Sequence, residues 1–464
     1  MRKRFKFARG AIWLFLVLSI LLLGYTYYRA EIVYQGGYPE KYFQYYVISL
    51  TGILFWGVIL RLKDEIKLNI AMVTTSLVVG VYLVEITLNF TDHAGWGKFA
   101  AHTAVTKIDA RNKFQVYQDL KSEGVDATLS LRPAMFRSIK GVPGIEPLFP
   151  LGGLSGKVTV VKNETGKFMI YLSDRYGFNN PDLEWDASQT EWVLAGDSMA
   201  QGFAVQQGED IAGQIRSKTG ENVITLGMGG NGPLTELATL KEYAESRKPE
   251  TVLWLYYESN DLAELIEEKP VPLLTSYLQP QFSQNLMHRQ EEIDERLLEY
   301  FFERIKSKSE KLFFTGEPQE MAEYLWMTRI LRLYNIRRRL ESQSPKQHEA
   351  VMPLFTEILK KARDRVAAWG GKLYFVYVPS WLRYRDDVLY HDPSHIKRVE
   401  VIGVVKDLNL PVIDIHQEVF ANHPDPLSLF PFRAHAHYTP EGFSEVAKAI
   451  ILGVRNAQRR PSQE

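Results

Sequence analysis

The chain contains no cysteine, carries no net charge and shows no internal repeat or low-complexity tract. Without cysteine it can form no disulfide framework, thiolate metal site or cysteine nucleophile. Lysine plus arginine number 55, as do aspartate plus glutamate, which excludes a globally basic nucleic-acid binder, although not a local patch. We expect no nucleic-acid partner. The 464 residues are 45% hydrophobic and 24% charged, as in ordinary folded proteins, and their number allows two or three domains.

Apolar residues crowd the first ninety positions of the chain. Three runs, at about 11–28, 43–60 and 68–90, are long enough to cross a bilayer as helices. A single run of this kind is also typical of a buried core helix or of a signal peptide. Because three of them follow one another closely, we predict that residues 1–90 form a membrane anchor with three transmembrane helices.

The basic residues beside these runs predict the orientation of the anchor. Five precede the first run, namely Arg2, Lys3, Arg4, Lys6 and Arg9. The loop between the second and third runs contains Arg61, Lys63 and Lys67. Because such residues favour the cytoplasmic side, the N-terminus should be cytoplasmic. Three spans then place the rest of the chain outside. We expect a multi-pass protein of the inner (plasma) membrane whose remaining residues are periplasmic or extracellular.

The rest of the chain divides into a connecting region and an α/β domain. Residues 91–190 are predicted to connect, with short strands in KVTVVKN and FMIYLSD; Asn163 begins an Asn-Glu-Thr sequon, interpreted as accidental. In residues 191–464, apolar strands alternate with helices. Alternation of this kind predicts a parallel sheet covered on both faces, with the site at the carboxyl ends of its strands. A helical insertion at about 262–349 is either a lid or partner contact, or padding of the fold.

A serine follows the first strand of this domain in the sequence L-A-G-D-S-M-A. Gly196 allows a sharp turn, and Ser198 would then lie exposed at the beginning of a helix, in a positive local field. This is the position of a nucleophile. The tripeptide Gly-Asp-Ser alone is weak evidence for a nucleophile, because a turn with a serine N-cap gives the same pattern.

Two further motifs follow the next two strands. L-G-M-G-G-N-G at 226–232 is either a plain tight turn or a turn that aims a backbone N–H at a developing oxyanion. In E-S-N-D at 258–261, Asn260 is either a helix cap or a donor to the same oxyanion.

H-A-H-Y-T-P-E-G-F at 435–443 comes just before the last helix. A histidine there is the natural general base for Ser198 at neutral pH. His435 and His437 could also suggest a metal, but only His423 or Asp425 is near enough in sequence to add a ligand. We expect neither a metal nor another cofactor.

In this order, the four motifs resemble the SGNH hydrolase superfamily, also called GDSL esterases and lipases. The resemblance covers about 190–265 and 370–452. It implies a three-layer α/β/α sandwich with a parallel, flavodoxin-like sheet. It also implies that Ser198 is the nucleophile and His437 the general base. The oxyanion hole would combine the N–H groups of Ser198 and Gly230 with the amide of Asn260.

The sequence departs from the family pattern at two positions. Glu258 stands where the family usually has glycine, and Ala434 stands where its acid lies, three residues before the histidine. A backbone carbonyl could orient His437 in a Ser–His dyad. Otherwise the groups that could orient or neighbour it are Asp197, His435, Asp425 and Glu441.

These features support two hypotheses. The first is a membrane-anchored extracytoplasmic serine esterase or O-acyltransferase, acting on acetyl esters of cell-surface or exported polysaccharide. The second is a catalytically degenerate SGNH domain that binds carbohydrate or acts as a scaffold in envelope assembly. Both place the protein in the membrane, with a polysaccharide or another acyl ester as ligand and other envelope proteins as candidate partners.

Overall fold

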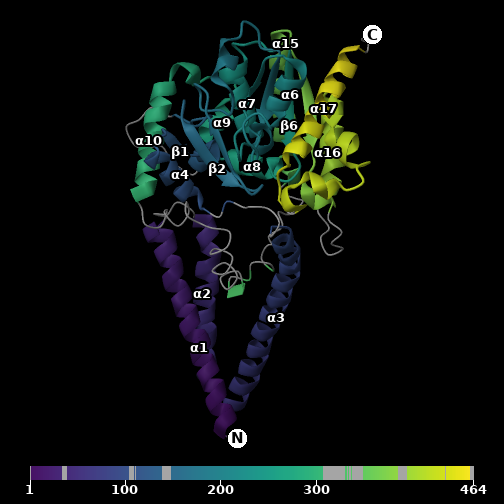
Figure 1. Ribbon diagram of the computed structural model, residues 1–464. Helices are drawn as coiled ribbons and strands as arrows, with labels where there is room; N and C mark the ends of the chain where they lie inside the picture. Colours follow the sequence, from purple (N-terminus) through teal and green to yellow (C-terminus); the bar gives the residue numbers. More distant parts are fainter. Residues whose placement is uncertain are drawn as a thin grey trace. The chain divides into compact units, whose positions relative to one another are not determined.

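The computed structural model describes residues 2–33, 39–103, 109, 111–137, 148–306, 330–331, 333, 336, 348–384, 394–433 and 435–459. The chain divides into two compact units (Figure 1). The helical unit comprises Met1–His93 and Leu325–Leu340, and the globular unit comprises Ala94–Tyr324 and Glu341–Glu464.

Within its described residues, the helical unit contains three helices long and apolar enough to cross a membrane. They are α1 (Arg2–Tyr27), continued by the π-helical η1 (Tyr28–Val33), α2 (Pro39–Ile59) and α3 (Asp64–Thr103). The stretches suited to spanning are Arg4–Ile32, Tyr42–Ile59 and Asp64–Leu88. Phe15 of α1 stacks on Trp56 of α2, and Arg9 forms an ion pair with Asp64 at 2.9 Å. The predicted set of three helices is therefore present, with α3 extending beyond the apolar run.

A small sheet precedes the predicted parallel sheet in the chain. Its parts are α4 (Lys113–Ser122), β1 (Ala127–Leu129), the 3-10 helix η2 (Pro133–Phe136), β2 (Val158–Asn163) and β3 (Phe168–Leu172). β1 pairs with β2 in parallel, and β2 pairs with β3 as an antiparallel hairpin. The two strands that the sequence predicted are thus β2 and β3, whereas β1 was too short to give a signal. Because β1 and β2 are parallel, their carboxyl ends lie at one edge of this sheet.

The large sheet is parallel throughout. Its strands are β4 (Trp192–Gly196), β5 (Val223–Thr225), β6 (Thr251–Tyr257), β7 (Lys372–Val378) and β8 (Val412–Asp414). They lie in the order β5-β4-β6-β7-β8, which brings the ends of β4, β5 and β6 together at one carboxyl edge. These five strands are the five that the sequence predicted.

Side chains alternate between the two faces of the large sheet, and each face is covered. Val252 and Trp254 of β6 pack into a core with α7 (Pro233–Thr239) and α15 (Met352–Ala368). Leu253 and Leu255 pack on the opposite face, against α6 (Ile211–Thr219) and α17 (Pro440–Arg459). Runs of apolar residues buried on both sides are typical of parallel sheets. The three-layer α/β/α sandwich predicted from the sequence is confirmed.

The remaining elements complete the globular unit. They are η3 (Asp182–Asp186), α5 (Ser198–Gln201), η4 (Leu240–Ala244), α8 (Asp261–Glu268), α9 (Pro272–Ser276), η5 (Leu286–His288), α10 (Gln290–Lys306), η6 (Trp381–Tyr384), α16 (Ser394–Asp407), η7 (His416–Phe420), η8 (Pro426–Leu429) and η9 (Pro431–Arg433). Of the insertion expected at 262–349, residues 307–329 and most of 330–347 lie outside the described residues.

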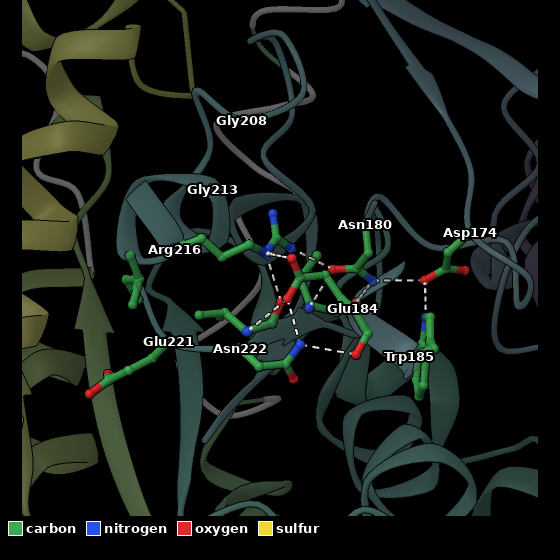
Figure 2. A network of polar contacts seen from close by, with 12 residues as sticks. Asp174, Asn180, Glu184, Trp185, Gly208, Gly213, Arg216, Glu221 and Asn222 are labelled. Atoms are coloured by element: carbon green, nitrogen blue, oxygen red, sulfur yellow. Dashed lines mark hydrogen bonds and ion pairs between the residues drawn. The ribbon is translucent and has the colours of Figure 1, made fainter. Parts of the chain in front are cut away.

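A polar network covers the open edge of β5 (Figure 2). The side-chain amide of Asn180 accepts the Thr225 N–H at 2.8 Å and donates to the Thr225 carbonyl at 2.9 Å, as a neighbouring strand would. Asn180 also donates to the buried carboxylate of Asp174 and accepts from Arg216. Burial raises the pKa of Asp174 to about 6, although four donors, including Trp185, oppose the shift. The loop after β3 is thereby fixed to the large sheet.

Candidate active site

Ser198 begins α5, directly after β4. The turn needs glycine at 196, because a Cβ there would approach the Cβ of Ala200 to 2.8 Å and that of Leu255 to 3.1 Å. Asp197 caps α5 by accepting the Met199 N–H at 2.8 Å. The hydroxyl of Ser198 consequently lies at the carboxyl edge of the large sheet, at the first turn of a helix.

The side chain of His437 lies between that hydroxyl and a carboxylate. Its Nε2 is 2.9 Å from Oγ of Ser198, and its Nδ1 is 2.7 Å from Oε2 of Glu164. The Phe203 ring stacks on the imidazole with the ring centroids 4.5 Å apart. Ser198, His437 and Glu164 are 8%, 9% and 5% exposed, so bulk water has little access to the relay.

Glu164 stands at the tip of the β2–β3 hairpin, in the region that the sequence predicted only to connect. Lys162 forms an ion pair with its other oxygen at 2.9 Å. The next residue, Thr165, donates from its hydroxyl to the carbonyl of Ala204 at 3.0 Å. A small apolar cluster then joins the hairpin to the segment after α5, formed by Val161, Met169, Tyr171, Phe203 and Ala204. The hairpin is therefore held against the nucleophile turn by both polar and apolar contacts.

The charge on Glu164 decides which imidazole nitrogen carries the proton. Burial alone would raise the pKa of this carboxyl, but attraction and hydrogen bonding to His437, and then to Lys162, lower it below its usual range. An ionised carboxylate can only accept hydrogen bonds, so Nδ1 of His437 must donate to it. The lone pair of Nε2 then faces Ser198. A base in this tautomer can take the hydroxyl proton and becomes an imidazolium beside a fixed negative charge.

The three groups expected in the oxyanion hole lie on neighbouring elements at the same edge. Asn231 ties the glycine turn to β4, because its amide donates to the Gly196 carbonyl at 3.4 Å. Gly230 has a φ of +82°, a conformation that glycine adopts at little cost. The amide of Asn260 donates to Oδ2 of Asp197 at 3.1 Å, the same oxygen that lies 3.2 Å from Oγ of Ser198. One amide hydrogen of Asn260 thus positions the side chain beside Ser198, and the other has no acceptor among the described residues.

Buried carboxyl groups lie behind the nucleophile. Burial raises the pKa of Asp197, against the opposing hydrogen bonds from Met199 and Asn260. Burial, with repulsion from other carboxylates in the group, raises the pKa values of Glu236 and Asp261 well above their usual range. These shifts favour the protonated, uncharged forms. Protonated carboxyl groups carry no negative charge, so these three acids would repel a negatively charged substrate oxygen less than three carboxylates would.

Two of the residues that the sequence proposed beside His437 are placed elsewhere, whereas Asp197 and His435 lie near enough to interact with it electrostatically. Asp425 binds Arg433 in a two-bonded ion pair at the surface, and Glu441 is exposed in the first turn of α17. His435 packs edge-on against Phe432, while Ala434 lies outside the described residues. Within the described ranges, no group of three or more histidine, aspartate and glutamate side chains is arranged to hold a metal ion.

Glu258, the second departure from the family pattern, has a structural role. Its buried carboxylate forms an ion pair with Arg383 and accepts hydrogen bonds from the Tyr377 hydroxyl and, at 2.6 Å, from the Ser380 N–H. These contacts fix the segment after β7 against the end of β6. The glutamate is therefore explained by the packing of this chain and carries no implication of lost activity.

Sequence reasoning missed Glu164. It belongs to the Asn-Glu-Thr sequon that was interpreted as accidental, and it precedes the serine in the chain instead of lying near the histidine. The one available signal was its place between two predicted strands, which makes it the tip of a hairpin. Nothing in the spacing indicates which part of the molecule that tip contacts.

No family model and no curated protein matches the chain. Among solved structures, it is similar to a lipase/acylhydrolase from Enterococcus faecalis, with 14% identity and a TM-score of 0.31 over 60% of this chain and 100% of the other. It is also similar to an acetyl xylan esterase, with 12% identity and a TM-score of 0.31 over 57% and 99%. An acetyl-xylooligosaccharide esterase from Geobacillus matches with 13% identity and a TM-score of 0.32 over 58% and 95%.

The fold agrees with the order of the motifs in the sequence. The parallel sheet and its two helical layers are those that the resemblance of the motifs to the SGNH hydrolase superfamily implied.

Proposed function

We propose that the protein is a membrane-anchored serine esterase or O-acyltransferase. The observation that carries this proposal is the continuous relay from Oγ of Ser198 through the imidazole of His437 to the carboxylate of Glu164. A binding module has no need of a hydroxyl, a base and an ionised acid in this order. The binding alternative was motivated by the missing acid and by Glu258, and both now have another explanation.

The reaction is acyl transfer in two steps. Oγ of Ser198 attacks the ester carbonyl while Nε2 of His437 takes its proton, and Glu164 stabilises the imidazolium. Negative charge that develops on the carbonyl oxygen is met by N–H groups of Ser198, Gly230 and Asn260. The imidazolium then protonates the leaving alcohol. In the second step, water or a sugar hydroxyl gives its proton to His437 and attacks the acyl-enzyme, and His437 returns that proton to Oγ of Ser198 as the bond between the acyl group and Oγ breaks.

The anchor supports an extracytoplasmic substrate. Arg9 at the beginning of α1 pairs with Asp64 at the beginning of α3, so the basic ends identified in the sequence lie at one end of the helical unit. By the positive-inside rule, that end faces the cytoplasm. We therefore infer that the site faces the cell exterior or periplasm, where acetylated polysaccharide is available as substrate.

The proposal is tested on the full-length protein in detergent. We expect hydrolysis of p-nitrophenyl acetate and labelling by a fluorophosphonate, both abolished by Ser198→Ala. The exposed Ser122→Ala on α4 is the matched control and should retain both. Addition of an oligosaccharide acceptor separates the two activities, because a transferase forms the sugar ester instead of free acetate. Absence of both turnover and labelling in the wild-type protein would exclude this function.

The orientation has its own test, because the native chain lacks cysteine. Ser428→Cys places a single thiol at an exposed position of the globular unit, and Lys6→Cys places one in the N-terminal segment. A membrane-impermeant maleimide should label the first in intact cells and the second only after permeabilisation. The reverse pattern would contradict the extracytoplasmic site.

A further inference from the structure

Arg132 is a cation without a fixed partner beside the candidate active site. It follows β1 and is partly buried, and its side chain forms no hydrogen bond or ion pair among the described residues. Its guanidinium lies against the glycine turn: a Cβ on Gly229 would be 3.2 Å from Nη1 of Arg132. Gly229 directly precedes Gly230, a proposed oxyanion donor. A partly buried guanidinium left unpaired at such a place is available to a ligand.

The topology of the small sheet explains this position. β1 and β2 are parallel, so the residues that follow them emerge at the same edge. Arg132 follows β1, and Glu164 follows β2. The segment after β1 is also built onto the glycine turn, because Arg137 donates to the Gly230 carbonyl and Ala134 lies where a side chain at Gly230 would reach. Arg132 is therefore held at the site by the element that holds the turn.

A lysine also lies near Arg132. Lys113, the first residue of α4, is partly buried, and burial together with repulsion from Arg132 and Lys162 lowers its pKa to about 7. Among the described residues, Lys113 forms no ion pair. Arg132 and Lys162 thus both repel Lys113. Such mutual repulsion is relieved when an anion binds between them.

The nearby carboxylates do not fill this role. Glu264 attracts Arg132, but its carboxylate is bound by Arg137, which also pairs with Glu268 at 3.1 Å. Glu164 is shared between His437 and Lys162. Both of these carboxylates are therefore already bound to other groups.

We propose that Arg132, supported by Lys113, forms a subsite for a carboxylate on the acyl-ester substrate, which would make the preferred substrate an acidic saccharide ester. This rests on the proposed function, because it defines the substrate class of the same site. Arginine suits this task because its planar guanidinium binds a carboxylate through two parallel hydrogen bonds. The group would orient the sugar while Ser198 attacks the ester.

The experiment measures binding and specificity separately. Full-length Ser198→Ala protein is titrated calorimetrically with an oligoglucuronate and with a neutral oligoglucoside of the same length. We expect the charged ligand to bind more tightly, and Arg132→Gln to weaken its binding roughly tenfold, as loss of a charge-assisted hydrogen bond does, without affecting the neutral ligand. Arg459→Gln, a change at an exposed arginine of α17, is the matched control. In the active protein, Arg132→Gln should lower the ratio of kcat/KM for acetylated glucuronic acid over acetylated glucose by a similar factor.

The possible results separate this proposal from the function on which it rests. Equal binding of the two oligosaccharides, or unchanged binding of the charged one by Arg132→Gln in a protein that melts normally, would overturn the subsite. Binding of glucose 6-phosphate without binding of the oligoglucuronate would overturn it in favour of a phosphate ligand. Absence of turnover and fluorophosphonate labelling would refute the esterase instead, while the calorimetric result still decides the subsite.

Discussion

The two sheets of the globular unit contribute to the candidate site in different ways. The large sheet is parallel, and its central strands β4 and β6 are buried along their whole length. Its loops supply Ser198, Gly230 and Asn260. The small sheet is mixed and partly exposed, and it supplies Glu164 and Arg132. The comparison teaches that the proposed nucleophile comes from the regular part of the fold, whereas the proposed acid and substrate-binding arginine come from an added hairpin and loop.

The largest expected effect comes from removing the contribution of the small sheet to the relay. Glu164→Gln keeps the shape of the side chain but removes the charge that fixes the tautomer of His437. We expect kcat for p-nitrophenyl acetate to fall by about 10²–10⁴-fold, as when the acid of a triad is lost. Glu349→Gln, at an exposed glutamate of the same type, should leave kcat unchanged. A fall of less than threefold would mean that Ser198 and His437 act as a dyad that does not need the carboxylate of Glu164.

Asn260→Ala removes a group that the large sheet contributes. Its amide is held by Asp197 next to Ser198, so the loss should appear in kcat more than in KM. We expect a decrease in kcat of about 10²-fold, the usual cost of one oxyanion donor. Steady-state kinetics with p-nitrophenyl acetate measure it, and an increase in KM alone would assign Asn260 to substrate binding.

Asn180→Ala tests the connection between the loop after β3 and the large sheet. The substitution removes four hydrogen bonds of the Asn180 side chain. Two are to the backbone of Thr225, one is to the guanidinium of Arg216 and one is to the carboxylate of Asp174. We expect the free energy of unfolding to fall by about 2–4 kcal/mol, and the melting temperature by several degrees. Asn456→Ala on the exposed side of α17 should change neither. An unchanged melting temperature would show that the edge of β5 needs no such cover.

The smallest expected effect is a pH dependence of stability. The folded protein holds the pKa of Glu164 below its ordinary value of about 4.3, so the ionised carboxylate stabilises the fold above that pH. As the pH falls below about 4.3 toward the folded-state pKa, the unfolded chain takes up the proton first and this stabilisation is lost. The difference in melting temperature between wild type and Glu164→Gln should therefore be constant above about pH 5 and narrow by a few degrees below pH 4. A difference that widened with acid would contradict the ion pair.

Much of the fold was predictable because its signals are local. The apolar runs of the helical unit, the alternation of five strands with helices, and Pro440 at the beginning of α17 are all readable within short windows. Ser198, Gly230, Asn260 and His437 were identified from motifs that follow strands or precede a helix. β1, with only three residues, and the chain direction of the small sheet gave no such signal.

The acid of the relay could not be predicted, because its partner is distant in the chain. Glu164 lies 273 positions before His437, and their contact depends on how the hairpin packs on the segment after α5. The role of Glu258 could not be predicted either, because its partner is also distant in the chain. From the sequence it is only a departure from a family pattern, whereas its ion pair with Arg383 gives it a role in packing.

By itself, the sequence determined the apolar helices, the parallel sandwich and which residues stand at the ends of its strands. These properties follow from hydrophobic periodicity and turn chemistry, which act between neighbours in the chain. Only the tertiary structure decided which acid faces His437, which arginine lies unpaired beside the glycine turn, and which carboxyl groups are buried. Those properties depend on burial and on distances between remote segments, and a linear sequence does not record them.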